Sequence, residues 1–207
     1  MIKGYNENYL NDVMDNLGNM FDYAVNVYNL NIDDFGNDYI ASDVSQGIEI
    51  GNVFYLNKSS IELFHLIYKH LPYIAMETPN NYNKKTKEYW LGCSIGYYQW
   101  YSQYKFSTIF NAVKLSELLM MYDTLHEADI MKFCELIDIK IKNSPTQLQR
   151  LRKNVGISQS TLAKLSGIKV RTIQSYEQRE SDINKAQVNQ IRSLSLVLGC
   201  NMEDLLE

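Results

Sequence analysis

The chain has 207 residues, of which 45% are hydrophobic and 21% are charged, values close to those of ordinary globular proteins. This composition argues against a disordered tail protein, and the length allows one large domain or two modest ones. The sequence contains no run of about 18 apolar residues and no apolar stretch near its start, so we expect no membrane segment, no signal peptide and a cytoplasmic location. The three cysteines form no CxxC pair, which favours reduced, buried thiols.

The net charge of −4 is divided unequally along the chain. Residues 1–143 contain 11 Lys and Arg against 18 Asp and Glu, a balance of −7, whereas residues 144–207 contain 9 against 6, a balance of +3. An acidic body with a short basic end is typical of a protein that contacts nucleic acid through one domain only. An excess of +3 is also ordinary for a domain of this size, so the charge alone leaves both interpretations open. We expect two domains, residues 1–143 and residues 144–207.

Helical periodicity dominates residues 1–143. From residue 6 to residue 28, apolar side chains recur every three or four positions and predict one long amphipathic helix. Further helices are predicted from Ser59 or Ser60 to Leu71, from Thr86 to about Tyr104, from Ser116 to Tyr122, and from about Ala128 to Lys142. Residues 47–57 alternate briefly and are compatible with an extended segment, and the polar residues 79–85 predict a loop. The body is therefore predicted to be all-α.

The most unusual part of the body is the segment 89–104, which is rich in tyrosine and tryptophan. On a helix that turns about 100° per residue, six rings fall within an arc of about 120°. We call them the aromatic stripe: Tyr89, Trp90, Tyr97, Trp100, Tyr101 and Tyr104. Leu91, Ile95 and Tyr98 are predicted to extend the apolar arc, and Glu88, Gln99 and Gln103 to occupy the remaining side. The segment is either the central core helix of the body or an aromatic platform for a protein partner, since Tyr and Trp carry much interface energy.

Groups that would carry catalysis are scarce. Glu62 and His65 form one Glu-x-x-His pair of the kind that di-iron helical bundles use twice, but there is no second copy. A solvated or hydrogen-bonded pair is therefore favoured over a metal site. His70 and His126 have no partners at the spacing of metal ligands, and the motifs of nucleotide-binding loops, zinc proteases and serine hydrolases are missing. We expect no enzyme, no metal and no cofactor.

Three short helices are predicted at the start of the basic end. Ser144 and Pro145 are suited to begin the first, Ser158 is suited to cap the second, and Gly167 to end it. The third is predicted from about Val170 to Gln178. The inward side chains are expected to be Leu148, Leu151 and Val155 in the first helix, Leu162, Ala163 and Leu165 in the second, and Ile173 and Tyr176 in the third. The tight glycine turn between the second and third helices indicates a helix-turn-helix.

A fourth helix is predicted from Lys185 to Leu198, with Val188, Ile191, Leu194 and Leu198 inward, followed by a terminal turn at residues 201–206. Together with this pattern, the stretch SQSTLAKLSGIKVRTIQSYE at residues 158–177 resembles the Xre or lambda-repressor-like family of DNA-binding domains. The resemblance extends from about Gln147 to Leu206 and implies five helices in about 60 residues. The expected fold is all-α, an N-terminal helical domain followed by a five-helix lambda-repressor-like domain.

In the family that the chain resembles, the third helix enters the major groove of DNA. The resemblance therefore implies base contacts from Val170, Arg171, Gln174 and Ser175. Arg171 is suited to bond both acceptors of a guanine, although a solvated surface charge is the alternative. Phosphate contacts are expected from Gln159, Lys169, Arg179 and Lys185, each of which has an idle surface position as its alternative. Glu177 would repel phosphate, and the resemblance implies a structural ion pair between it and Arg152, for which a phosphate contact is the alternative.

The resemblance also implies a function. We expect a transcription regulator that binds a double-stranded DNA operator as a homodimer, because a single reading helix covers little DNA. The body loosely resembles the amino-terminal extension of some Xre-type proteins of toxin–antitoxin operons, which suggests an antitoxin that represses its own operon and holds a partner toxin. A ligand-sensing repressor and an interaction module that no longer reads DNA are the alternatives.

Overall fold

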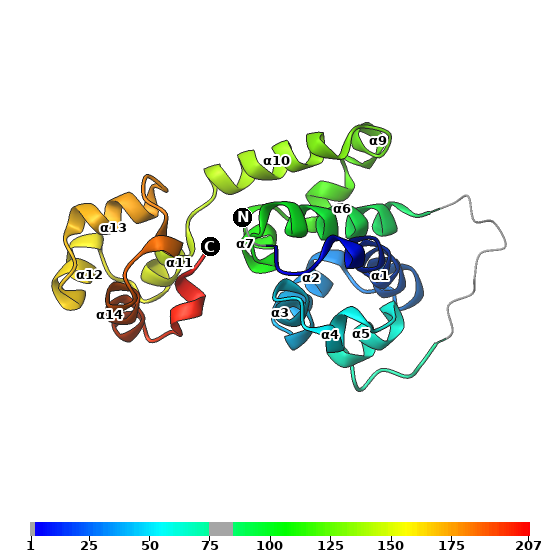
Figure 1. Ribbon diagram of the computed structural model, residues 1–207, viewed down its shortest axis with the longest axis horizontal. Helices are drawn as coiled ribbons and strands as arrows, with labels where there is room; N and C mark the ends of the chain where they lie inside the picture. Colours follow the sequence, from blue (N-terminus) through cyan, green and yellow to red (C-terminus); the bar gives the residue numbers. More distant parts are fainter. Residues whose placement is uncertain (1–2, 75–84) are drawn as a thin grey trace. The chain divides into compact units, whose positions relative to one another are not determined.

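The computed structural model describes residues 3–74 and 85–207 and divides the chain by its contacts into two compact units (Figure 1). Unit 1 comprises Met1–Lys140 and unit 2 comprises Ile141–Glu207. Every regular element of the described residues is a helix, which confirms the all-α fold class. The loop predicted at residues 79–85 lies outside the described residues except for Lys85.

Unit 1 is built mainly from short helices. In chain order the elements are η1 (Glu7–Tyr9), α1 (Leu10–Asp22), the π-helical turn η2 (Tyr23–Val27), α2 (Ile32–Ile40), α3 (Asp43–Glu49), α4 (Val53–Leu56), α5 (Ser60–Ile67), α6 (Lys87–Ser102), α7 (Phe106–Ala112), α8 (Leu115–Leu119), α9 (Tyr122–Leu125) and α10 (Ile130–Asn143). The longest of them are α6, α10 and α1, and the last residues of α10 belong to unit 2. The core of unit 1 is aromatic: the ring of Phe21, for example, meets the ring of Phe35 edge-on, with 5.1 Å between the centroids.

Helices α1 and α6 lie side by side at very short range (Figure 1). A Cβ on Gly92 of α6 would lie 2.5 Å from the carbonyl oxygen of Leu17, and a Cβ on Gly18 of α1 would lie 2.6 Å from the Sγ of Cys93. Real Cβ atoms essentially never come so close, so Gly92, which faces the backbone of α1, requires glycine for this approach. At Gly18 a Cβ would force the side chains of Cys93 and Tyr89 to move. Because neighbouring elements enclose α6 on more than one side, Glu88 and Gln99 are 6% and 2% exposed, and the prediction that a polar side would remain outside the core is wrong for them.

Several sequence-based boundaries in unit 1 need correction. The single helix expected over residues 6–28 is confirmed as a continuous run of helical turns over residues 7–27, in which η1, α1 and η2 follow one another without a break. Residues 47–57 contain the end of α3, a turn and α4 rather than an extended segment, because Gly51 adopts a φ of +69° in the turn and the side chain of Asn52 caps α4. The helix expected to reach Leu71 ends at Ile67. Helices α2 and α7 were not predicted. Cys134 is buried as expected, whereas Cys93 and Cys200 are partly exposed.

Unit 2 contains four α-helices and two short 3-10 turns. They are α11 (Gln147–Asn154), α12 (Gln159–Ser166), α13 (Val170–Glu177), η3 (Ile183–Lys185), α14 (Val188–Leu198) and η4 (Met202–Leu205). One apolar core joins them, and it includes Leu148, Leu162, Ile173, Leu194 and Leu205. The hydrophobic spacing of the sequence therefore predicted most of this core.

Two details of unit 2 differ from the sequence-based predictions. The cap of α11 is Thr146 rather than Ser144, because the Oγ1 of Thr146 accepts the hydrogen bond from the backbone N–H of Gln149 at 3.2 Å. Val155, Leu165 and Val188 were expected to face inward and are exposed. A helix of only about two turns has few inward positions, and in α12 Leu162 and Ala163 already occupy them.

Candidate nucleic-acid interface

The turn between α12 and α13 sets the angle between the two helices of the motif. Gly167 ends α12 with a φ of +72°, and its backbone N–H donates to the carbonyl of Ala163 at 3.0 Å. A Cβ at this position would meet no atom within 4 Å, so the glycine is needed for its left-handed backbone and not for space. Lys169 follows as the residue before α13 and is exposed.

Helix α13 is buried on one face and accessible on the other. Ile173 and Tyr176 face the core of unit 2, as predicted. On the accessible side Arg171 is exposed, and the other three predicted base-contact side chains, Val170, Gln174 and Ser175, are partly exposed. The hydroxyl of Ser175 lies 2.7 Å from that of Ser181 in the following loop, so it already has a partner within the domain. Arg171 is therefore the most accessible of the four.

The carboxylate of Glu177, at the end of α13, is bound from two other helices. Arg152 of α11 donates to it through Nε at 2.6 Å and through Nη2 at 2.8 Å, and Gln159 of α12 donates through Nε2 at 2.8 Å. The third guanidinium nitrogen of Arg152, Nη1, donates to the carbonyl of Ile157 at 2.8 Å. The hydrogen bonds to Glu177 raise the pKa of Arg152, against the opposing effect of burial. The negative charge at the end of α13 is thus neutralised inside the domain.

The four side chains predicted to bind phosphate fall into two groups. Lys169 and Lys185 are exposed, and the Nζ of Lys185 lies 3.2 Å from a carboxylate oxygen of Asp182. Gln159 and Arg179 are partly buried and hold other groups of unit 2. Gln159 bonds Glu177, and the guanidinium of Arg179 bonds the carbonyl of Ser144 at 2.6 Å and the side chain of Glu207 at 2.8 Å. Sequence reasoning missed Glu207, since no local pattern links positions so far apart.

The aromatic stripe of unit 1 is neither fully buried nor fully exposed. Trp90 contacts Tyr122 and Phe133 edge-on, with centroid distances of 5.5 and 5.7 Å. Trp100 donates through Nε1 to the carbonyl of Tyr5 at 3.2 Å, and the ammonium of Lys3 lies 4.3 Å from the centre of its ring. These two rings help to hold α6 in place.

The other four rings of the stripe are more varied. The hydroxyl of Tyr89 donates to the carboxylate of Asp15. Tyr97 and Tyr101 stack with nearly parallel rings 6.2 Å apart, and Tyr101 is 38% exposed. Tyr104 is partly exposed. Of the six rings, Tyr101 is exposed and the other five are partly buried.

Glu62 and His65, the Glu-x-x-His pair of the sequence, both make contacts within unit 1. Glu62 forms a capping box with Ser59 at the start of α5 and an ion pair with Lys58 at 2.8 Å. These contacts lower the pKa of the Glu62 carboxylate to about 2. His65 stacks on Tyr73 with 5.7 Å between the ring centres. Within residues 3–74 and 85–207, no group of three or more His, Cys, Asp or Glu side chains is arranged to hold a metal ion.

A search of the described helices for one long and apolar enough to cross a membrane finds none. No curated protein and no solved structure shows a match to the chain. Residues 148–205 do match a family model described as Helix-turn-helix. This range contains α12, its glycine turn and α13, the elements whose geometry is described above. Unit 2 therefore carries a helix-turn-helix domain of the Xre-like family, and the chain is a DNA-binding regulator.

Proposed function

We propose that unit 2 reads a specific double-stranded DNA operator with the exposed side of α13. The observation that carries this proposal is the distribution of charge along that helix. Arg171 is exposed in its first turn, whereas Glu177 in its last turn is bound by Arg152 and Gln159 and is almost completely buried. A helix with a free cation at its start and a neutralised anion at its end is suited to approach DNA.

We assign base contacts to Val170, Arg171, Gln174 and Ser175, and phosphate contacts to Lys169 and Lys185, which are exposed. The side chain of Gln159 donates to Glu177, so we assign a phosphate contact to its backbone N–H instead. This N–H lies at the first position of α12, where the helix dipole favours phosphate. The protein is expected to act as a homodimer, because one reading helix covers too little DNA for high specificity. A cytoplasmic location is part of this proposal.

For unit 1 we propose the role of an antitoxin domain that holds a toxin, while the whole chain represses its own operon. Two observations support a protein-binding role. Residues 1–143 carry a balance of −7, which repels DNA and attracts a partner with a basic contact surface. The aromatic stripe also leaves the stacked pair Tyr97 and Tyr101 accessible on α6.

The antitoxin role is tested by expressing the neighbouring small reading frame alone and together with this chain. We expect the neighbour to stop growth alone and the full-length chain to restore it. Arg171→Ala should still restore growth while losing repression of the operon promoter, because Arg171 lies in unit 2 and the toxin is expected on unit 1. A neighbour that is harmless when expressed alone would contradict the antitoxin role and leave DNA reading untouched.

A ligand-sensing repressor is the second candidate, and one feature of unit 1 favours it. A hollow of about 550 Å³ opens beside α2, α3 and α5, and its lining includes Asp38, Asp43, Tyr55, Tyr68 and His70. The hydroxyl of Tyr68 donates to Asp38 at 2.6 Å in its wall. Under this alternative a small molecule from the host would change the affinity for DNA, and Tyr68→Ala would abolish that response.

A further inference from the structure

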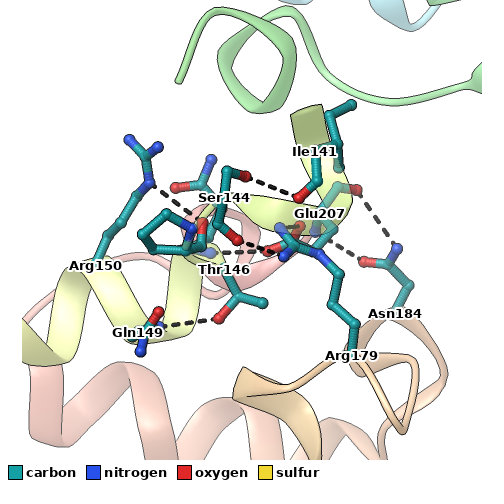
Figure 2. Close-up of polar contacts among 10 residues, drawn as sticks. Ile141, Ser144, Thr146, Gln149, Arg150, Arg179, Asn184 and Glu207 are labelled. Carbon is teal, nitrogen blue, oxygen red and sulfur yellow. Dashed lines mark hydrogen bonds and ion pairs between the residues drawn. The ribbon is translucent and has the colours of Figure 1, made fainter. Parts of the chain in front are cut away.

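Arg179 occupies an unusual place directly after the reading helix. Its backbone has a φ of +55°, a left-handed conformation that costs energy for any residue with a Cβ and persists only where other contacts hold it. Its side chain is 22% exposed and turns into unit 2 (Figure 2). There Nη1 donates to the carbonyl of Ser144 at 2.6 Å and Nη2 donates to Oε2 of Glu207 at 2.8 Å. Both ends of the guanidinium fork are therefore occupied.

Glu207 receives bonds from three separate segments of unit 2. Besides Arg179, its Oε1 accepts from the backbone N–H of Gln147 at 2.7 Å, at the amino end of α11 where a carboxylate is favoured by the helix dipole. Its backbone N–H donates to Oδ1 of Asn184 at 3.1 Å, and its carbonyl accepts from Nδ2 of Asn184 at 3.4 Å. The Glu207 side chain is only 10% exposed. Figure 2 shows the bonds that join Glu207 to Arg179 and to Asn184.

We infer that Arg179 and Glu207 are positioning residues for DNA reading, and we call their ion pair the latch. The inference rests on the proposed function, in which α13 reads DNA. The latch joins the loop that leaves α13 to the start of α11 and to η3, so it fixes the angle at which α13 is presented. Arg179 thereby acts through the position of α13 and not through a bond to phosphate.

The direction in which DNA affinity changes when either charge is removed tests this inference. If Arg179 and Glu207 acted only through their charges, losing the cation would weaken DNA binding and losing the anion would strengthen it. The latch instead predicts that both losses weaken DNA binding, because either one frees the loop that follows α13. Since the two side chains act as one unit, losing both should cost no more than losing one.

The experiment uses the full-length chain and a DNA duplex selected by the wild-type protein from a random-sequence pool. The Kd is measured by fluorescence anisotropy over a series of salt concentrations for Arg179→Gln, Glu207→Gln and the double variant. We expect each variant to raise the Kd roughly tenfold, which corresponds to a loss of about 1.4 kcal/mol of binding free energy. For Arg179→Gln the slope of log K against log salt should stay at the wild-type value, whereas Lys169→Gln should reduce it by about one.

Two further variants separate positioning from other roles. Arg179→Lys keeps the charge that a phosphate contact needs, but one ammonium does not reproduce the fork that spans Ser144 and Glu207, so we expect it to bind as poorly as Arg179→Gln. Glu180→Gln removes an exposed carboxylate from the same loop and should leave the Kd unchanged or lower it. All measurements are made at a temperature where circular dichroism shows every variant folded, because a residue that only adds stability would then leave the Kd unchanged.

The outcomes distinguish the latch from the function on which it rests. Three results would each overturn the latch. The first is binding of DNA by Glu207→Gln that is as tight as that of wild type or tighter, and the second is binding by Arg179→Lys that is as tight as that of wild type. The third is a salt slope for Arg179→Gln that is reduced as much as that of Lys169→Gln. If Arg171→Ala loses affinity while the latch variants do not, the proposed function stands and the latch alone is refuted. A wild-type chain that enriches no duplex would refute both.

Discussion

Glu177 and Arg152 form a two-point ion pair in which the carboxylate side chain is 1% exposed. The same carboxylate also accepts a bond from Gln159, so a single buried charge joins α11, α12 and α13. Burial of a charge costs free energy that its partners must offset, and here every carboxylate bond comes from another helix of the domain. We therefore expect the position of α13 to depend on Glu177 at its carboxyl end.

Removal of Glu177 alone should destabilise unit 2 strongly. We expect Glu177→Ala to lower the free energy of unfolding by about 3 to 5 kcal/mol, because Arg152 would be left as an uncompensated buried charge. Amide hydrogen exchange of peptides that cover α13 and α14 in the full-length chain measures this loss. Both tryptophans of the chain, Trp90 and Trp100, lie in unit 1, so their fluorescence during unfolding should show unit 1 unchanged.

The matched control for this prediction is Glu180→Ala, which removes an exposed carboxylate three residues further on. A surface change of this kind should alter the free energy of unfolding by less than about 0.5 kcal/mol. Equal exchange rates in wild type and Glu177→Ala would mean that the ion pair contributes nothing to the stability of unit 2.

Arg171 should determine the choice of one base pair. Arg171→Ala is expected to cost about 1 to 3 kcal/mol on the preferred duplex and to relax the preference at a single position, since a bidentate bond to guanine would be lost. Lys169→Ala, at the exposed residue just before α13, should weaken binding to all sequences alike. Binding to every single-base variant of the duplex measures both effects. Equal losses for Arg171→Ala on preferred and random DNA would reduce Arg171 to a phosphate contact.

Asp33 should make unit 1 less stable in acid. Burial raises the pKa of its carboxyl, but hydrogen bonds from the N–H and hydroxyl of Ser116, at 3.0 and 2.6 Å, together with the charge of Lys114, hold the pKa below its ordinary value. A carboxyl whose pKa is lower in the folded state stabilises the fold above its unfolded pKa, and that contribution is lost as the pH falls through the folded pKa. Wild type should therefore lose stability below about pH 4.

The comparison for this prediction is Asp33→Asn, measured by urea unfolding between neutral pH and pH 3 with tryptophan fluorescence. Its deficit relative to wild type should be largest near neutral pH and should shrink as the pH falls. Asp34→Asn changes the neighbouring exposed acid in the same first turn of α2 and controls for the helix dipole. A deficit for Asp33→Asn that stays constant over the whole pH range would contradict the assignment.

The chain should bind DNA as a dimer on a nearly palindromic site. Two α13 helices that read the same face of DNA require half-sites separated by about one helical turn, or a multiple of it. Footprinting gives the spacing, and light scattering of the complex gives the number of chains. A monomer that protects a single half-site at nanomolar concentration would rule out this arrangement.

Local signals predicted much of unit 2 and less of unit 1. Ser158 and Gly167 are strong cap signals that sit at both ends of α12, so the helix pair was predicted well. Ser144 and Pro145 were predicted to begin α11, whereas Thr146 caps it through a hydrogen bond with Gln149 that spacing alone does not reveal. Arg179 and Glu207 are far apart in the sequence and meet only in the folded domain. The sequence did not reveal this partner, so a phosphate contact was predicted for Arg179.

In unit 1 the sequence identified α6 and its aromatic stripe but misjudged the polar side of that helix. Glu88 and Gln99 are charged or polar, and a period of 3.6 residues places them opposite the rings. They are buried nevertheless, since the glycines at positions 18 and 92 let α1 approach α6 so closely. This burial depends on how two helices pack against each other, and a helical wheel of α6 alone does not predict it.

The last prediction concerns the aromatic stripe as a partner surface. Tyr101 is 38% exposed, and its ring stacks on that of Tyr97 and lies 5.5 Å from the ammonium of Lys3, whereas Trp90 contacts rings from α9 and α10. Tyr101→Ala should therefore leave the melting temperature of unit 1 nearly unchanged, and Trp90→Ala should lower it by several degrees. Thermal unfolding followed by circular dichroism checks both.

If the stripe holds a protein partner, Tyr101→Ala should also weaken that complex at least tenfold while DNA binding stays at the wild-type level, since exposed aromatic side chains often carry about 2 kcal/mol or more of interface energy. The partner is obtained by co-purification from the native host, identified by mass spectrometry and titrated against purified chain by calorimetry. Met120→Ala, which removes another exposed apolar side chain of unit 1 that is not part of α6, is the matched control and should bind as wild type does. Equal partner affinity for Tyr101→Ala, Met120→Ala and wild type would show that the partner binds elsewhere on the chain.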